Sequence, residues 1–137
     1  MITYHVYSKQ LEKVEIADGF FQGWIDPPSK KKHREILEKS YRALVAVDES
    51  KGEIVGFINA ISDGVLSCYI PLLEVLPKYQ HQKIGSELVI RMLADLSDFY
   101  MIDLCCDKEL QAFYEKVGMK PTLGMIKRNH VHPSRSK

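Results

Sequence analysis

Residues 65–96 have the sequence VLSCYIPLLEVLPKYQHQKIGSELVIRMLADL, and this stretch decides the fold. The first part, Val65–Leu76, is apolar almost without interruption, which predicts a strand covered on both faces and ended by Pro77. After Gly85 the apolar side chains recur three or four residues apart, which predicts an amphipathic helix. These apolar positions are Leu88, Val89, Met92, Leu93 and Leu96.

The polar turn between this strand and this helix, Gln80–Ser86, has the sequence QHQKIGS. It lies at a helix N-terminus, where unpaired backbone N–H groups and the positive end of the helix dipole come together. Helix N-termini of this kind bind phosphate groups. The turn is therefore the first candidate for a ligand site.

Length and composition limit the classes of protein to which this chain can belong. The 137 residues suffice for a single domain, residues 1–137, with a core of its own. Charged residues make up 27% and hydrophobic residues 45%, a globular balance that favours neither disorder nor a membrane span. The 19 Lys and Arg against 18 Asp and Glu give a net charge of +1, which does not suit nucleic-acid binding as the main task.

The cysteines and the N-terminal residues indicate the cellular compartment in which the protein is expected. Cys68, Cys105 and Cys106 have neither the spacing of a metal site nor that of a disulfide pair, so we expect no metal and a reduced compartment. Residues 1–10, MITYHVYSKQ, have neither the order of a signal peptide nor enough apolar length to cross a bilayer. The expectation is a cytoplasmic protein without a membrane partner.

The rest of the chain alternates strand and helix patterns. Asp63-Gly64 is a tight-turn dipeptide, so the strand that follows it should run antiparallel to the strand before it. A helical crossover should place the strand Tyr100–Cys106 parallel to Val65–Leu76. The predicted fold class is α/β, more strictly α+β: a mixed, mostly antiparallel central sheet with one βαβ unit and helices on both faces. The other expected elements are strands at Ile2–Tyr7, Tyr41–Val47, Ile54–Ile61 and Met119–Arg128, helices from Ser29 to about Lys39 and at Leu110–Val117 ended by Gly118, and a frayed tail at 129–137.

A run of basic residues, Lys30–Arg34, opens the helix capped by Ser29. Positive charge at a helix N-terminus opposes the dipole, by a few tenths of a kcal/mol up to about 1 kcal/mol per residue. One interpretation is a solvated face, and the other is a dock for an anionic substrate. The aromatic side chains before the run, Phe20, Phe21 and Trp24, are expected to pack in the core.

Two motifs carry a family resemblance. Val75-Leu76-Pro77 followed by Gln80-His81-Gln82-Lys83-Ile84-Gly85 matches a strand end and phosphate turn, and Phe113-Tyr114-Glu115-Lys116-Val117-Gly118-Met119 matches a second signature. With the order of elements, over essentially the whole chain, they resemble the GNAT superfamily of acyl-CoA-dependent N-acyltransferases. This sequence differs from the family pattern at two positions: Lys83 stands where the family usually has its first glycine, and His81 stands where glycine is frequent. If the backbone needs φ > 0 there, a lysine costs on the order of 1 kcal/mol relative to glycine, while its charge favours a pyrophosphate.

The resemblance implies acetyl-CoA as co-substrate and assigns residues to it. The pantetheine arm would pair with the backbone edge from Leu73 to Val75, where this strand splays from the next parallel strand. Asp107 stands where relatives often place an Asn that touches pantetheine, and an Asp accepts a hydrogen bond but cannot donate one. The pyrophosphate would lie on the turn residues Gln80, His81, Gln82, Lys83, Ile84, Gly85 and Ser86.

The resemblance also implies the chemistry. Tyr114 matches the family's general acid, while from the sequence alone a buried structural aromatic is nearly as good an interpretation. Glu74 is the only carboxylate in Val65–Leu76. Burying a carboxylate in a covered strand costs free energy unless it contacts water or a hydrogen-bonding partner, so Glu74 is a candidate base. Many family members deprotonate the amine through water instead. Cys105 and Cys106 are expected to be small buried packing residues and not nucleophiles.

The expected function is transfer of the acetyl group of acetyl-CoA to a primary amine by direct attack, through a tetrahedral intermediate. The acceptor is a small molecule or a peptide, and Phe20–Lys32 with Tyr69 should border its entrance. The length of the acyl group and a homodimer are left open. One alternative is a non-catalytic CoA-binding sensor or interaction module, against which the retained Tyr114 argues. The other is a nucleic-acid-associated protein using Lys30–Arg34 and Lys127–Lys137, against which the even charge balance argues.

Overall fold

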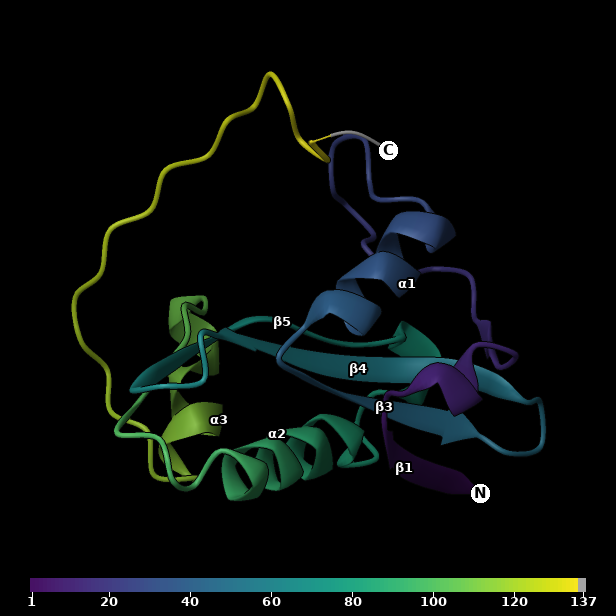
Figure 1. Ribbon diagram of the computed structural model, residues 1–137, viewed down its shortest axis with the longest axis horizontal. Helices are drawn as coiled ribbons and strands as arrows, with labels where there is room; N and C mark the ends of the chain where they lie inside the picture. The colour runs from purple at the N-terminus through teal and green to yellow at the C-terminus, as the bar shows by residue number, and fades with distance from the viewer. Residues whose placement is uncertain (136–137) are drawn as a thin grey trace.

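The computed structural model describes residues 1–135, and its centre is a six-stranded sheet with helices on both faces (Figure 1). The order along the sheet is β1-β3-β4-β5-β6, and β2 pairs with β4 at the end that β5 does not reach. Neighbouring strands are antiparallel except for β5 with β6 and β2 with β4. The predicted mixed, mostly antiparallel fold is therefore confirmed. The strands are β1 (Ile2–Val6), β2 (Glu15–Ile16), β3 (Arg42–Asp48), β4 (Glu53–Ser62), β5 (Ser67–Val75) and β6 (Met101–Asp103).

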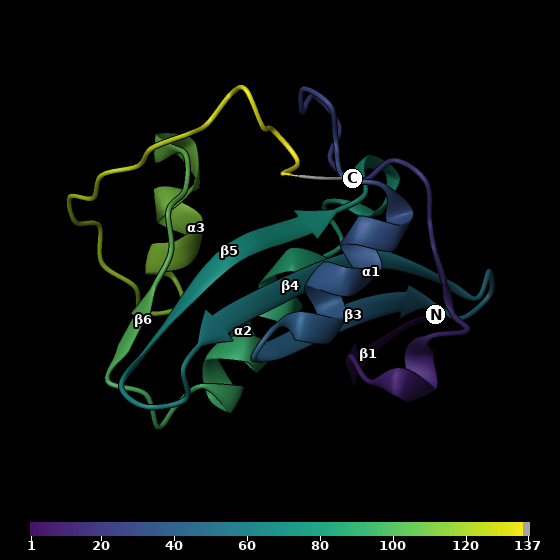
Figure 2. The same ribbon diagram turned by 45° about the horizontal axis from the view of Figure 1, so that its top comes forward.

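The helices lie where the sequence predicts them, with small shifts at their ends. They are α1 (Lys30–Lys39), α2 (Ile84–Asp95) and the short α3 (Gln111–Glu115), with single turns of 3₁₀ helix at Lys9–Leu11, Pro77–Tyr79 and Lys108–Leu110. The Ser29 hydroxyl accepts the Lys32 N–H at 3.1 Å, which confirms it as the N-cap of α1. Helix α1 covers one face of the sheet and α2 the other (Figure 2).

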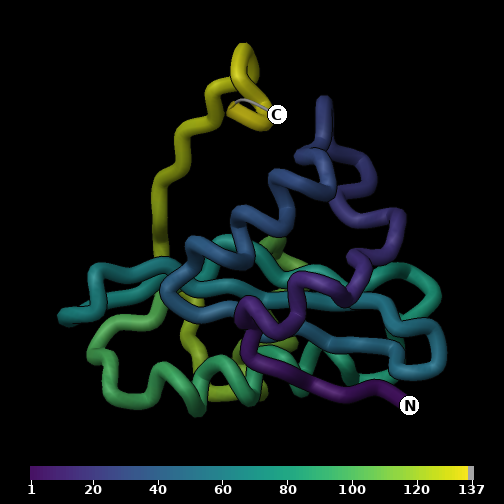
Figure 3. The backbone as a smooth tube through the Cα atoms, turned by 45° about the vertical axis from the view of Figure 1, so that its right-hand side comes forward, coloured from purple at the N-terminus to yellow at the C-terminus, as the bar shows by residue number. Residues whose placement is uncertain are grey.

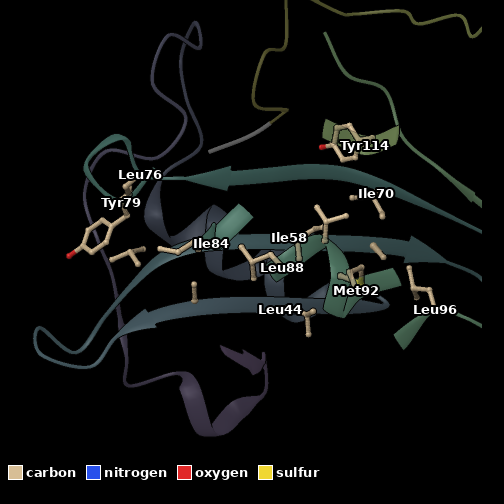
Figure 4. Close-up of a cluster of buried hydrophobic side chains, with 14 of the residues drawn as sticks. Leu44, Ile58, Ile70, Leu76, Tyr79, Ile84, Leu88, Met92, Leu96 and Tyr114 are labelled. Atoms are coloured by element: carbon tan, nitrogen blue, oxygen red, sulfur yellow. The ribbon is translucent and has the colours of Figure 1, made fainter. Parts of the chain in front are cut away.

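Two hydrophobic clusters result from this layering, one on each face of the sheet. Strand β3 shows the alternation most clearly, because Ala43, Val45 and Val47 belong to the cluster under α1 while Leu44 and Ala46 belong to the cluster under α2. A central strand buried on both faces has no polar side, which explains its continuous apolar sequence. Figure 4 shows the cluster under α2, where Leu88 and Met92 of the helix and Leu96 at its C-cap are fully buried.

Strand β5 differs from its prediction in extent and in burial. It begins at Ser67, and Val65 and Leu66 belong to the exposed connection that follows Asp63-Gly64. Its second half, from Leu72 to Val75, is only half-buried and so is not covered on both faces as expected. The physical reason is that β6 pairs with the first three residues of β5 alone, which leaves the second half without a neighbour on that side.

The predicted final strand is wrong. Residues 119–129 are extended but belong to no strand, and their chain stands away from the sheet (Figure 3). Leu123, Met125 and Ile126 are apolar, but the segment has no neighbouring strand within the described residues. Of the expected frayed tail, residues 130–135 form turns in which the Ser134 hydroxyl donates to the Asp26 carbonyl, and residues 136 and 137 lie outside the described part.

The basic residues at the start of α1, Lys30–Arg34, have different partners and do not form one charged surface. Lys30 pairs with Asp18 at 2.7 Å, and the Arg34 guanidinium donates to the Tyr7 hydroxyl and to the Val14 carbonyl, both at 2.8 Å. Arg34 thus fastens the loop between β1 and β2 to the helix. Lys31 is exposed and Lys32 is half-buried.

His33, in the middle of that run, is a core residue that the sequence does not reveal. It is 2% exposed and packs against the rings of Phe20, Phe21 and Phe57, with centroids 4.4–5.1 Å apart. Its Nε2 atom has no hydrogen-bonding partner. Burial in this aromatic cluster, reinforced by the charge of Arg34, lowers the pKa of His33 to about 4.

We therefore expect the protein to lose stability in mild acid through His33. The folded state binds a proton more weakly than the unfolded state, so the free energy of unfolding is unaffected above pH 6.5 and falls as the pH drops toward 4. The loss attributable to His33 should be on the order of 2–3 kcal/mol. Urea unfolding of the wild type and of His33→Phe at pH 7, 5.5 and 4.5 measures it. Equal pH slopes for the two proteins would contradict the prediction.

Candidate active site

The candidate site forms where β5 and β6 separate. The two strands pair only from Ser67 to Tyr69, opposite Met101 to Asp103, and β5 then continues alone to Val75. The register between β4 and β5 slips at the same place, because two residues of β5, Ile70 and Pro71, stand opposite the single Ala60. Such a bulge bends the strand and increases its twist. The expected splay is therefore present, and it exposes the backbone edge of β5.

A cleft of about 470 Å³ occupies the gap between the separated strands. It brings together four residues that the sequence assigned to the site: Leu73, Glu74, Asp107 and Tyr114. Gln22 and Trp24, from the segment expected to border the acceptor entrance, also line it, whereas Tyr69 lines a neighbouring hollow. Several lining residues were not anticipated, since only the bend of β5 and the path of the C-terminal segment bring them here: Ile70, Pro71, Leu104, Leu110, Ile126 and Arg128.

Tyr114 enters the cleft from α3. Its ring is 8% exposed, packs edge-on against Phe113 at 4.9 Å and lies over β5 (Figure 4). No group in residues 1–135 makes a hydrogen bond to its hydroxyl. Burial raises the pKa of Tyr114 to about 12, with a smaller contribution from Cys106. The hydroxyl is therefore protonated at neutral pH and free to donate.

Glu74 lies on the opposite side of β5 from Leu73, toward α1. Its carboxylate accepts the Phe21 backbone N–H at 2.7 and 3.1 Å. Phe21 has φ 63°, a conformation unusual for a residue with a side chain, so Glu74 holds a strained loop in place. Loss of solvent raises the pKa of Glu74, and the Phe21 N–H opposes that rise. A carboxylate whose pKa is raised is a better base near neutrality.

The predicted phosphate turn adopts the backbone that a glycine sequence would favour. His81 has φ 64° and Lys83 has φ 66°, so both positions where the resemblance placed glycine are left-handed. Lys83 is the N-cap of α2, and the N–H groups of the next helical turn have no acceptor within the helix. The turn therefore has the geometry of an anion cradle, although His81 and Lys83 are strained in it.

Contacts on both sides hold the turn in register with β5. The Gln80 side chain donates to the Val75 carbonyl at 3.0 Å, and the Tyr79 hydroxyl donates to the Asp48 carboxylate at 2.5 Å. Hydrogen bonds from Ser50 and Tyr79 lower the pKa of Asp48 to about 2, so the carboxylate stays ionised. The turn itself does not line the cleft, and the unpaired edge of β5 joins the two places.

Two lysines add positive charge beside the turn. The side chain of Lys51, on the β3–β4 connection, lowers the pKa of Lys78, because two ammonium groups close together resist ionisation. Both side chains are exposed, and the Lys78 ammonium lies over the Tyr79 ring, 5.5 Å from its centroid.

Cys105 and Cys106 border the cleft and are exposed, so the expectation that they are buried packing residues is wrong. Partial loss of solvent, with a further contribution from the charge of Asp107, raises the pKa of the Cys106 thiol, which does not favour a nucleophile.

Two general features complete the description of residues 1–135. No three His, Cys, Asp or Glu side chains in them are grouped so that they would hold a metal ion. None of their helices has the length and apolar character needed to cross a membrane.

Comparison with known proteins gives this geometry a context. The profile of the acetyltransferase (GNAT) family matches residues 10–119. A crystal structure described as an acetyltransferase from Deinococcus radiodurans R1 is 35% identical, with a TM-score of 0.86, over 97% of this chain and 92% of that one. A GNAT-family acetyltransferase from Streptococcus pneumoniae TIGR4 is 26% identical, with a TM-score of 0.70, over 95% of this chain and 99% of that one.

More distant structures share the fold alone. A glucosamine-6-phosphate N-acetyltransferase from Arabidopsis thaliana is 15% identical with a TM-score of 0.70, over 95% of this chain and 99% of that one. No curated protein matches the sequence significantly. The family profile spans the sheet, the phosphate turn and Tyr114, and the 35% identical structure covers nearly the whole chain. The chain belongs to the GNAT family of acetyltransferases.

Proposed function

We propose that this protein transfers the acetyl group of acetyl-CoA to a primary amine by direct attack, through a tetrahedral intermediate. The observation that carries the proposal is the unpaired edge of β5, which runs from the anion cradle at Gln80–Ser86 to a cleft containing Tyr114. A cofactor with a pyrophosphate at one end and amides along its arm would find a partner for each part: the N–H groups of the turn for the pyrophosphate and the backbone edge of β5 for the amides. The backbone of Leu73 to Val75 would pair with the amides of pantetheine, and Asp107 would accept from it.

In the proposed reaction Tyr114 protonates the departing thiolate. Its hydroxyl carries a proton at any physiological pH, since burial raises its pKa to about 12. Proton donation by Tyr114 should increase the rate only moderately, because the thiolate of a thiol with a pKa of about 8.5 is already a fair leaving group near neutrality. Cleft backbone N–H groups, freed where β5 and β6 separate, would polarise the thioester carbonyl.

Glu74 is the proposed base, directly or through a water molecule. Two facts support this role: its raised pKa and its position in the cleft on the side of Gln22 and Trp24. It also anchors the Phe21 backbone, so a variant must separate the two roles. Glu74→Gln keeps an oxygen that can accept from Phe21 and removes the base.

The amine acceptor is a small molecule or a peptide. Trp24 offers it an apolar wall, while Gln22 and Arg128 offer polar contacts at the same cleft. A non-catalytic CoA-binding module is the second candidate, because it needs only the cradle and the unpaired edge of β5. Release of free thiol from acetyl-CoA, measured against a panel of amines and peptides, separates the two functions.

Acetyl-CoA should raise the thermal midpoint of unfolding, because a ligand that binds only the folded state stabilises it. Desulfo-CoA should do the same, since the cradle and the β5 edge do not need the acyl group. Differential scanning fluorimetry at up to millimolar ligand measures both. An unchanged midpoint with both ligands would exclude this cofactor.

Substitutions at Lys83 separate the effect of its charge from that of its backbone. Lys83→Gly and Lys83→Ala remove the same charge, but only glycine relieves the left-handed conformation. We expect Lys83→Gly to be more stable than Lys83→Ala by about 1 kcal/mol in urea unfolding. Both variants should bind acetyl-CoA several-fold more weakly by calorimetry if the ammonium group contacts phosphate. Unchanged affinity in both would show that the charge plays no part.

Tyr114→Phe tests the acid without disturbing the core. It removes the hydroxyl and keeps the ring against Phe113, so stability and acetyl-CoA affinity should change little. We expect kcat to fall by about 10²-fold, the lower end for general acid catalysis. Tyr41→Phe is the matched control, because it loses a hydroxyl outside the cleft and the neighbouring hollow. Full kcat in Tyr114→Phe would leave water as the proton donor.

A further inference from the structure

Two adjacent thiols at the rim of the cleft take no part in the proposed acetyl transfer. Cys105 and Cys106 follow β6, in the connection to the 3₁₀ turn at Lys108–Leu110, and both are exposed and line the cleft. The third cysteine, Cys68, is buried and donates to the Met101 carbonyl. The adjacent pair is therefore open to chemistry from the cleft, and Cys68 is not.

The two exposed thiols have different neighbours. Interaction with the Cys105 thiol is the main reason why the pKa of the Tyr69 hydroxyl is raised, so Cys105 lies against the tyrosine of the neighbouring hollow. Besides burial, the charge of Cys106 contributes to the raised pKa of Tyr114. Of the pair, Cys106 is thus the thiol on the side of the Tyr114 hydroxyl.

Tyr114 shows where a ligand sulfur would lie. It is 8% exposed and lines the cleft, and its hydroxyl has no hydrogen-bonding partner in residues 1–135. A buried hydroxyl that faces a cleft without a partner is satisfied by an atom of a ligand. In the proposed function, on which this inference rests, that atom is the sulfur of CoA. The cofactor sulfur and the Cys106 sulfur are then neighbours of the same hydroxyl.

We propose that Cys106 is a modification site, at which the oxidised cofactor, CoA disulfide, forms a mixed disulfide with the protein. The Cys106 thiolate attacks the sulfur of the CoA unit that occupies the cleft. The bond between the two CoA sulfurs breaks as the bond between Cys106 and CoA forms, and the second CoA leaves as a thiolate that takes up the proton lost by Cys106. One disulfide is exchanged for another, so no further oxidant is needed.

The surroundings of Cys106 favour this disulfide over others. Positive charge activates a thiol, and among the described residues that line the cleft the one cation is Arg128, against the carboxylates of Glu74 and Asp107. Partial loss of solvent raises the pKa of Cys106, so little thiolate is present at neutral pH and disulfides in free solution should react slowly. A disulfide anchored by its pyrophosphate and pantetheine arm is instead held at high effective concentration beside the thiol.

The adduct would regulate the proposed reaction. A CoA unit bonded to Cys106 fills the cleft and the anion cradle, so acetyl-CoA can no longer bind. A reducing thiol that attacks the mixed disulfide releases CoA and restores the site. Acetyl transfer would then respond to the redox state of the cofactor itself, without any change in the fold.

Intact-mass spectrometry of the full chain tests the proposal. After incubation with CoA disulfide we expect one added CoA per chain, which dithiothreitol removes. The adduct should form at least about tenfold faster than the adduct with glutathione disulfide at the same concentration, and excess desulfo-CoA should suppress it, because the advantage comes from the CoA site. Equal rates with the two disulfides, or no suppression by desulfo-CoA, overturn the proposal without any substitution in the chain.

Two variants identify the sulfur that reacts. Cys106→Ser should form no adduct, whereas Cys105→Ser, the matched control, should form it at the wild-type rate, because it removes the adjacent exposed thiol and leaves Cys106 beside Tyr114. Each serine replaces one sulfur by an oxygen, so both variants should keep the wild-type circular dichroism. An adduct that persists in Cys106→Ser or disappears in Cys105→Ser contradicts the assignment. So does a loss of two hydrogens without added CoA, which would report a disulfide between the two cysteines.

A thermal shift separates this inference from the proposed acetyl transfer, because desulfo-CoA reports the CoA site without thiol chemistry. A raised midpoint with an unmodified Cys106 overturns the modification site and leaves the proposed function in place. An adduct on a protein that acetylates no amine supports the modification site and overturns the proposed catalysis. An unchanged midpoint together with no adduct overturns both.

Discussion

The structure depends on the early end of the pairing between β5 and β6. Three residue pairs join the strands, and beyond Tyr69 the bulge at Ile70 and Pro71 turns β5 away. Proline has no N–H to contribute to a ladder, so pairing past this point would be incomplete in any case. The separation creates the cleft and leaves half of β5 with free backbone groups. A sheet that paired fully along β5 would be more regular and would have no place for a ligand.

The second requirement is that the polar turn Gln80–Ser86 be held rigidly at the far end of β5. Tyr79 and Asp48 join the turn to the β3–β4 connection, and Gln80 joins it to Val75. These bonds compensate for two left-handed residues, His81 and Lys83, that would otherwise favour another conformation. A cradle formed in advance loses less entropy when an anion binds. Strain in the turn is thus balanced by contacts outside it.

The loop between β2 and α1 has a similar construction. Phe21 is left-handed, its N–H is held by Glu74, and its ring belongs to the aromatic cluster around His33. One carboxylate therefore shapes the wall of the cleft and, in the proposed reaction, receives a proton there. Its two roles use different lone pairs, since a carboxylate has about four acceptor sites. Protonation of Glu74 would weaken the anchor and the base together.

The sequence by itself determined the family, the order of the helices and of most strands, and the polar turn before α2, because periodicity, caps and turn dipeptides act between residues close in the chain. It also indicated Lys83 as the irregular position, since glycine and lysine differ in local backbone energy. Only the tertiary structure decided which residues are buried, which line the cleft and which strands pair. His33 is buried despite four basic neighbours, Arg128 reaches the cleft, and the predicted strand at Met119–Arg128 has no partner among residues 1–135. Burial and strand pairing are contacts between distant segments, and a local pattern does not contain them.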